Sequence, residues 1–141
     1  YTATQNLKTF GTGILPSHYL EMVKSRLYDG DTAAAWTIHR VVRDFMTAFS
    51  PVCPFFTHHI SSTIYGKSAV EVDEFPSPAI SNQQLEEKLR SVTTDLQVFN
   101  GEVWATKKEN GISLNQPISG IVVPESLDGF SDILTSMHSL E

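Results

Sequence analysis

The stretch DTAAAWTIHRVVRDFMTAFSPVCPFF, residues 31–56, decides the fold. Asp31 is a favourable N-cap, and apolar side chains recur after it at helical spacing as far as Phe49. Pro51 ends this helix, because the residue before a proline disfavours the α region, and Pro54 suits the first turn of the next one. The stretch therefore predicts two successive helices. We assign to the apolar face of the first one Trp36, Val41, Phe45, Met46 and Phe49.

Further helices are predicted on both sides of this stretch. Residues 1–28 show helical spacing, but Gly11, Gly13 and Pro16 interrupt it, so we expect a break or a kink near residues 11–16. The helix that opens at Pro54 is expected to stop at Gly66.

The longest predicted helix follows a proline-punctuated connector. Ser81 and Gln84 form a capping-box pattern at its start, and Asn110-Gly111 is a stop signal at its end. Its apolar stripe consists of Leu85, Leu89, Val92, Leu96, Phe99 and Val103.

The pattern changes after Gly111. Residues 118–123 have the composition of a short β-strand, and residues 128–138 that of a short amphipathic helix. We therefore predict a mainly α protein. An antiparallel bundle of about four helices, residues 1–110, precedes a small αβ extension of linker, short strand and short helix, residues 111–141.

Composition narrows the class of protein. With 40% hydrophobic and 18% charged residues among 141, the chain is typical of folded, water-soluble proteins. No apolar run approaches the roughly 20 residues of a membrane span, and the single cysteine, Cys53, fits a reducing compartment. We expect a cytoplasmic protein without a membrane partner. Because Tyr1 opens directly in a helical pattern with no initiator methionine, we also expect the chain to be part of a longer protein.

Charge is distributed unevenly. The net charge is −6, yet residues 1–70 hold six Lys/Arg against four Asp/Glu, whereas residues 71–141 hold four against twelve. Because phosphates are attracted by local positive potential, a nucleic-acid partner would prefer the N-terminal half. Acidic surfaces such as that of the second half are usually just solvated.

The sequence offers no catalytic or metal-binding pattern. His58 and His59 lie near Cys53, but adjacent helical residues point about 100° apart, so the two imidazoles cannot easily share one ion. We expect no metal and no catalytic residue here. On the first helix, His18, Glu21 and Lys24 share a face. That face is either solvated, with ion pairs inside the helix, or directed at a phosphate backbone.

Four segments, taken in order, carry a family resemblance. His18–Arg26, HYLEMVKSR, is followed by the alanine-rich helix 33–49 with Ser50–Phe55, SPVCPF. Next come Ile64–Gly66 and the acidic-aromatic-proline run Glu74–Pro76, and last Lys107–Asn115, KKENGISLN. In this order the segments resemble the C-terminal, anticodon-binding region of archaeal valyl-tRNA synthetases, which are class I aminoacyl-tRNA synthetases.

The resemblance implies a parent ligase that uses ATP to attach valine to its tRNA. The catalytic HIGH and KMSKS signatures are not in these residues. We therefore expect this part to be inactive alone and to hold no cofactor, ATP being bound by the parent's catalytic domain in cis. The expected partner is the anticodon stem-loop of a valine tRNA. Positive charge within the matching segments makes Lys24, Arg26, Arg40, Arg43, Lys107 and Lys108 our candidates for tRNA contacts.

Three alternatives stay open at this point. The chain could be the same domain of an isoleucyl- or leucyl-tRNA synthetase, with the same physical function and another tRNA. It could be a helical protein-interaction module, which an exposed apolar patch without a basic rim would favour. A small independent hydrolase would instead need a cleft with a nucleophile bonded to a base.

Overall fold

The structure, a computed structural model, describes residues 1–67, 75–77 and 82–141, and it is mainly α-helical as the sequence predicts. The chain folds as two compact units. The first consists of Tyr1–Pro16 and Lys24–Ala79, and the second of Ser17–Val23 and Ile80–Glu141. No helix in the described ranges is long and apolar enough to cross a bilayer.

The first 28 residues form one helical run rather than a broken one. It starts as α1, Thr2–Thr9, continues as a π-helical segment, Phe10–Leu20, and ends as α2, Glu21–Tyr28. The break predicted near residues 11–16 thus takes the form of a change in helical register. Pro16 explains the change: it has no N–H to donate, and in an α-helix its ring would clash with the carbonyl four residues earlier. A wider π turn relieves that clash.

Helix α3, Thr32–Phe49, begins where the sequence predicts. The Asp31 carboxylate accepts hydrogen bonds from the backbone N–H groups of Ala33 and Ala34, at 2.9 and 3.1 Å. Helix α4, Pro54–Tyr65, has its proline in the first turn and ends at Gly66, whose φ of 67° lies in the left-handed region. Both helix predictions are confirmed.

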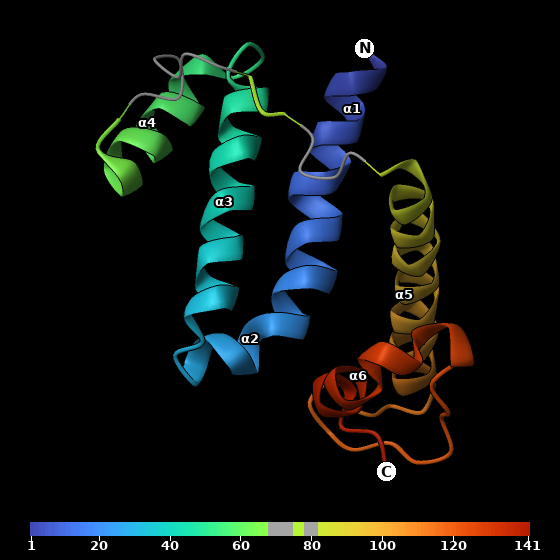
Figure 1. The fold of residues 1–141 in the computed structure, drawn as a ribbon. Coiled ribbons are helices and arrows are strands. Elements are labelled where there is room, and N and C mark those ends of the chain that lie inside the picture. The colour runs from blue at the N-terminus through green and yellow to red at the C-terminus, as the bar shows by residue number, and fades with distance from the viewer. Residues whose placement is uncertain (68–74, 78–81) are drawn as a thin grey trace. The chain divides into compact units, whose positions relative to one another are not determined.

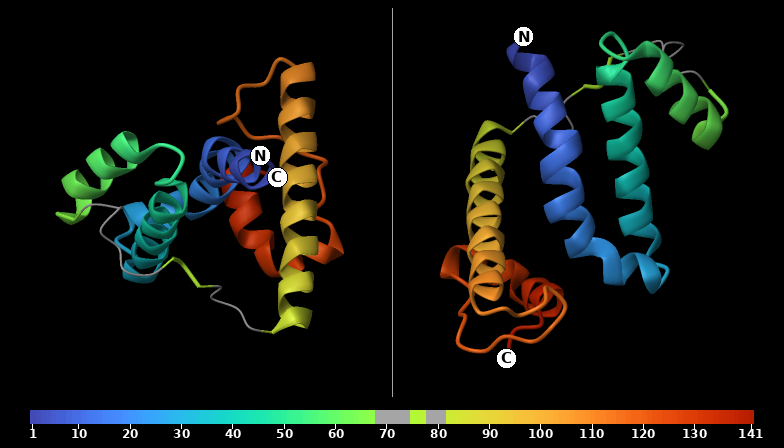
Figure 2. Two further views of the ribbon diagram at one scale, coloured as in Figure 1. Left: turned by 90° about the horizontal axis from the view of Figure 1, so that it is seen from above. Right: turned by 180° about the vertical axis from the view of Figure 1, so that it is seen from behind.

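Helices α1 and α3 run antiparallel and side by side, and α4 packs on α3 (Figures 1 and 2). Gly11 allows the close approach, because a Cβ built there would lie 2.4 Å from the Phe45 ring. That ring also contacts Phe10 and Phe49, with ring centroids 6.1 and 5.4 Å apart. Aromatic packing therefore holds the start of the chain on the C-terminal half of α3.

The second unit is built on α5, Gln83–Glu109. Its N-cap is Asn82, whose side-chain oxygen accepts from the N–H groups of Gln84 and Leu85. Ser81, on which the sequence predicted a capping box, lies outside the described residues. The chain leaves the helix at Asn110-Gly111, as predicted.

The C-terminal segment packs against the second half of α5 (Figure 1). It contains a 3₁₀ helix, η3, Glu125–Phe130, and helix α6, Ser131–His138. Phe99 and Val103 of α5 form a core with Leu127 and Leu134, each at most 4% exposed. Leu85 and Leu89, which the sequence placed in the same stripe, are instead 45% and 39% exposed.

The predicted strand at residues 118–123 is wrong. Within the described residues its only β-type pairing is a single parallel bridge between Ile118 and Leu140. Gly120 has a positive φ of 82°, which breaks the extended run, and Pro124 adopts an extended conformation before η3. The residues after Gly120 contribute Ile121 and Val123 to the α5 core as irregular chain.

Candidate nucleic-acid interface

The six basic residues predicted to contact tRNA lie on three helices. Lys24 and Arg26 are on α2, Arg40 and Arg43 on α3, and Lys107 and Lys108 in the last turn of α5. Arg40 and Arg43 line one hollow together.

Arg26 has a structural partner. Its Nε donates to Asp31 Oδ2 at 2.8 Å, and its Nη2 lies 2.7 Å from the same oxygen. The other Asp31 oxygen caps α3. The N–H of Ala34, together with Arg26, holds the pKa of Asp31 below its usual range. Arg26 therefore braces the turn between α2 and α3, while Lys24 is exposed on α2.

Lys107 is fully buried, and this overturns its assignment as an RNA contact. Its ammonium donates to the backbone carbonyls of Leu114, Gln116 and His138 at 2.8, 2.7 and 2.7 Å. Burial lowers the pKa of Lys107. An ammonium enclosed by three carbonyls is not accessible to a phosphate, so we assign Lys107 a structural role. Its neighbour Lys108 is exposed.

A chain of hydrogen-bonded polar side chains starts at His138, whose backbone carbonyl accepts from the buried lysine. His138 Nε2 lies 2.7 Å from Asn100 Oδ1, and Asn100 Nδ2 lies 3.0 Å from His18 Nδ1. The His18 ring packs on Trp104, with centroids 5.3 Å apart. The sequence left two interpretations of the helix face that carries His18: a solvated face, or a face directed at a phosphate backbone. Neither describes His18 itself, because its ring nitrogen hydrogen-bonds to Asn100 within the second unit.

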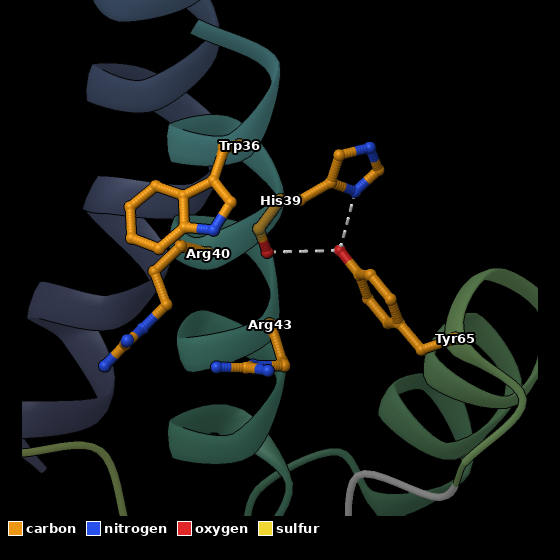
Figure 3. A pocket seen from close by; sticks show the side chains of 5 residues that line it. All are labelled: Trp36, His39, Arg40, Arg43 and Tyr65. Carbon is orange, nitrogen blue, oxygen red and sulfur yellow. Dashed lines mark hydrogen bonds between the residues drawn. The ribbon is translucent and has the colours of Figure 1, made fainter. Parts of the chain in front are cut away.

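The hollow on the first unit combines aromatic and cationic side chains (Figure 3). It has a volume of about 120 Å³ and is lined by Trp36, His39, Arg40, Arg43 and Tyr65. Four of these residues come from α3, where the spacing 36, 39, 40, 43 places them on one helical face. Tyr65 comes from the last turn of α4.

The packing of α4 on α3 fixes the Tyr65 rim of the hollow. The Tyr65 hydroxyl donates to the His39 carbonyl oxygen at 3.2 Å and lies 3.2 Å from His39 Nδ1. The two rings meet edge to face, with centroids 5.9 Å apart. Partial burial raises the pKa of Tyr65, against the opposing effect of the Arg43 charge. The phenol is therefore neutral at physiological pH.

Trp36 is 67% exposed, so its assignment to the apolar core face of α3 is wrong. Beside it, Arg40 donates through Nε to Asp44 Oδ2 at 2.7 Å. In the ranges 1–67, 75–77 and 82–141, Arg43 makes no ion pair. The sequence did contain a signal that this face is not apolar, namely the arginines four and seven residues after the tryptophan.

The histidines near Cys53 show no metal-binding arrangement. Among the described residues, no three His, Cys, Asp or Glu side chains are grouped so that they could hold an ion.

Comparison with known proteins identifies the family. Residues 1–122 match the model of the family described as "Anticodon-binding domain of tRNA ligase", and the chain belongs to this family. Among curated relatives, the valine--tRNA ligase of Saccharolobus solfataricus is 30% identical over 120 residues, 84% of this chain and 14% of that protein. The corresponding enzyme of Aeropyrum pernix is 30% identical over 135 residues, 89% of this chain and 16% of that protein.

The chain spans about one seventh of the length of these relatives. The valine--tRNA ligase of Methanosarcina barkeri, at 27% identity, is matched over 94% of this chain and 15% of its own length. The resemblance predicted from the sequence is confirmed. No solved structure matches the chain.

Proposed function

We propose that this chain binds the anticodon stem-loop of a valine tRNA, as part of a cytoplasmic protein that attaches valine to that tRNA with ATP. The observation that carries the proposal is the family match over residues 1–122, together with relatives that are named as valine--tRNA ligases. The names of those relatives support the choice of a valine tRNA.

The surface of the first unit supports an RNA partner on physical grounds. Anticodon loops present unstacked bases and a phosphate backbone, which proteins bind with aromatic rings and with arginine. The α3 hollow supplies an exposed indole and two guanidinium groups, and Lys24 is exposed on α2. Arg40, Arg43 and Lys24 remain our candidates for phosphate contacts, while Arg26 and Lys108 are secondary ones.

Catalysis is proposed to take place elsewhere in the whole protein. The 141 residues carry neither the HIGH nor the KMSKS signature. The catalytic domain would be joined in cis and would bind ATP, with no cofactor held by this part. We therefore expect the purified chain to give no valine-dependent ATP–pyrophosphate exchange. Exchange that co-purifies with the chain and responds to substitutions in it would contradict this assignment.

The binding test uses the 141-residue chain with stem-loops of the valine, isoleucine and leucine anticodons. We expect the valine stem-loop to bind most tightly. Affinity should fall as salt rises, because neutralised phosphates release counterions. Arg43→Gln should weaken binding at low salt and reduce the slope of log K against log salt by about one. Equal binding of all three stem-loops would contradict the valine assignment, and absence of binding at low salt would contradict the function.

A matched control comes from the acidic half of the chain. Glu87→Gln removes a charge from an exposed position of α5. It should leave affinity unchanged or raise it slightly by relieving repulsion. Glu86 is less suitable because its carboxylate pairs with Arg90 at 2.7 Å. A double change that includes Arg26 is also less suitable, because the loss of Arg26 would remove the ion pair with Asp31, the residue that caps α3.

A further inference from the structure

We infer that the α3 hollow is a subsite for one unstacked nucleotide of the bound RNA, with the base on the Trp36 indole and its phosphate on Arg40 and Arg43. The inference rests on the proposed function and specifies the residues that perform it. It concerns the first unit alone.

The first argument is the exposure of Trp36. An indole left 67% exposed contributes little to folding, because most of its apolar surface stays in water. It lies one helical turn before Arg40 and two turns before Arg43, so the ring and both cations share one face of α3 (Figure 3). A nucleotide has the matching arrangement, a flat aromatic base joined to an anionic phosphate.

The second argument concerns the availability of the two arginines. Arg40 contacts Asp44 through Nε, and the structure gives no other partner for its guanidinium within the described ranges. Arg43 forms no ion pair in the described part of the chain. Charge-assisted hydrogen bonds from arginine to phosphate are among the stronger polar contacts, and here the donors remain available for them.

The third argument is that the hollow is held in shape before a ligand arrives. Tyr65 bonds to His39 from the neighbouring helix, and Asp44 bonds to Arg40 from within α3. Both rims are thus carried by helices and not by a loop. A preformed site needs less ordering on binding, which favours affinity.

The combination favours a nucleotide over an acidic peptide. A peptide carboxylate would use the two guanidinium groups but would leave the indole face open. Stacking on an aromatic ring is insensitive to base identity, because every base has a π face. The subsite therefore contributes affinity and selects an unstacked base, while the identity of that base is read elsewhere.

The experiment isolates Trp36 by fluorescence, since the chain has two tryptophans. In a Trp104→Phe chain, Trp36 is the only tryptophan, and addition of the valine stem-loop should quench its emission as the base stacks. A Trp36→Phe chain, in which Trp104 alone reports, serves as the matched control and should change little. An acidic peptide of the same charge should not quench Trp36, and quenching by the peptide would overturn the choice of ligand.

Affinity measurements complete the test. Trp36→Ala should weaken stem-loop binding by roughly five- to a hundredfold, and Trp36→Phe, which keeps an aromatic ring, should retain most of the affinity. The stem-loop is also prepared as a series in which each member lacks one loop base. One member of the series, the one that lacks the base stacked on Trp36, should bind the parent chain and the Trp36→Ala chain with equal affinity. Circular dichroism should show that both variants stay folded, as expected for an exposed side chain.

The outcomes separate the subsite from the function. If the parent chain binds the stem-loop but Trp36→Ala binds equally well and no quenching occurs, the subsite is overturned while the proposed function stands. If the parent chain binds no stem-loop at low salt, the proposed function itself fails. Quenching of Trp36 emission, together with a loss of affinity on Trp36→Ala that disappears when one loop base is removed, supports both the subsite and the proposed function.

Discussion

Lys107 of α5 donates a hydrogen bond of 2.7 Å to the backbone carbonyl of His138, the last residue of α6. The last carbonyls of a helix have no partner within that helix, and a buried one must find a donor elsewhere. The same ammonium bonds the carbonyls of Leu114 and Gln116 in the preceding segment. One side chain therefore fastens three separate points of the C-terminal segment to α5.

Replacing Lys107 by methionine should destabilise the second unit by several kcal/mol. The aliphatic length is kept, but three carbonyls lose their donor: the buried one of His138 and those of Leu114 and Gln116, whose bonds to Lys107 are partly buried. Each buried group left unsatisfied costs about 1–3 kcal/mol. The measurement is urea unfolding followed by Trp104 fluorescence in a Trp36→Phe chain. Lys108→Met on the exposed neighbour is the control and should shift stability by no more than about 0.5 kcal/mol. Equal stability of the two variants would show that the carbonyls are satisfied without Lys107.

Acid should destabilise the second unit through His138. Burial, together with the nearby Lys107 charge, lowers the pKa of His138 to about 4 from an ordinary value of 6.5. Between these pH values the unfolded state binds the proton and the folded state does not, so stability is full above pH 6.5 and falls as pH drops towards 4. The shift corresponds to at most about 3 kcal/mol.

His18 acts in the same direction, because burial lowers its pKa as well. With Asn100 Oδ1 taken up by His138, the Asn100 amide donates to His18 Nδ1, which can accept only while unprotonated. The measurement is unfolding free energy against pH from 4 to 7, compared between the parent chain and His138→Gln. The variant should show a flatter dependence; an identical slope would assign the acid sensitivity to other groups.

Much of the helical framework could be predicted because its signals are local. Asp31, Pro51, Pro54 and Gly66 act on the backbone within a few residues of themselves, so the bounds of α3 and α4 follow from the sequence. The register change around Pro16 was less predictable. A proline inside a helix is compatible with a break, a kink or a π segment, and packing decides among them.

The candidate site was only partly predictable, because burial depends on distant parts of the chain. Arg40 and Arg43 were identified by charge and do lie in one hollow, but Trp36 was assigned to the core by hydrophobicity alone. Lys107 has the sequence context of an ordinary basic residue in a last helical turn. Its burial arises when residues up to His138 fold back on α5, which no local pattern reveals.

We expect Asp31, in the turn between α2 and α3, to stabilise the first unit. Asp31→Ala removes both the cap of α3 and the partner of Arg26 and should lower the thermal midpoint. Asp31→Asn should have a smaller effect, because asparagine also caps helices but carries no charge for Arg26. Thermal melting followed by Trp36 fluorescence in a Trp104→Phe chain compares the two.

The pH dependence tests the contribution of the Asp31 charge, which both the N–H of Ala34 and Arg26 stabilise. Its folded pKa is lowered, so its charge stabilises the fold above the ordinary carboxyl pKa, and this benefit is lost as pH falls below it. The difference between the parent chain and Asp31→Asn should therefore shrink in acid. A difference that is constant with pH would mean that the charge of Asp31, in the cap and in the Arg26 ion pair, contributes nothing measurable.

Gly11→Ala should weaken the packing of the π-helical segment Phe10–Leu20 on α3. The added Cβ would lie 2.4 Å from the tip of the Phe45 ring, which is confined by Phe10 on one side and Phe49 on the other. Overpacking of this kind costs about 1–3 kcal/mol, more than the roughly 1 kcal/mol that alanine gains over glycine in a helix. Gly13→Ala is the matched control, since nothing lies within 4 Å of a Cβ at that position. Urea unfolding of the Trp104→Phe chain, followed by Trp36, should place Gly11→Ala below the parent and Gly13→Ala at or above it. Equal stability of the two alanine variants would mean that the Phe45 ring moves aside freely and that the close approach of the helices does not depend on glycine.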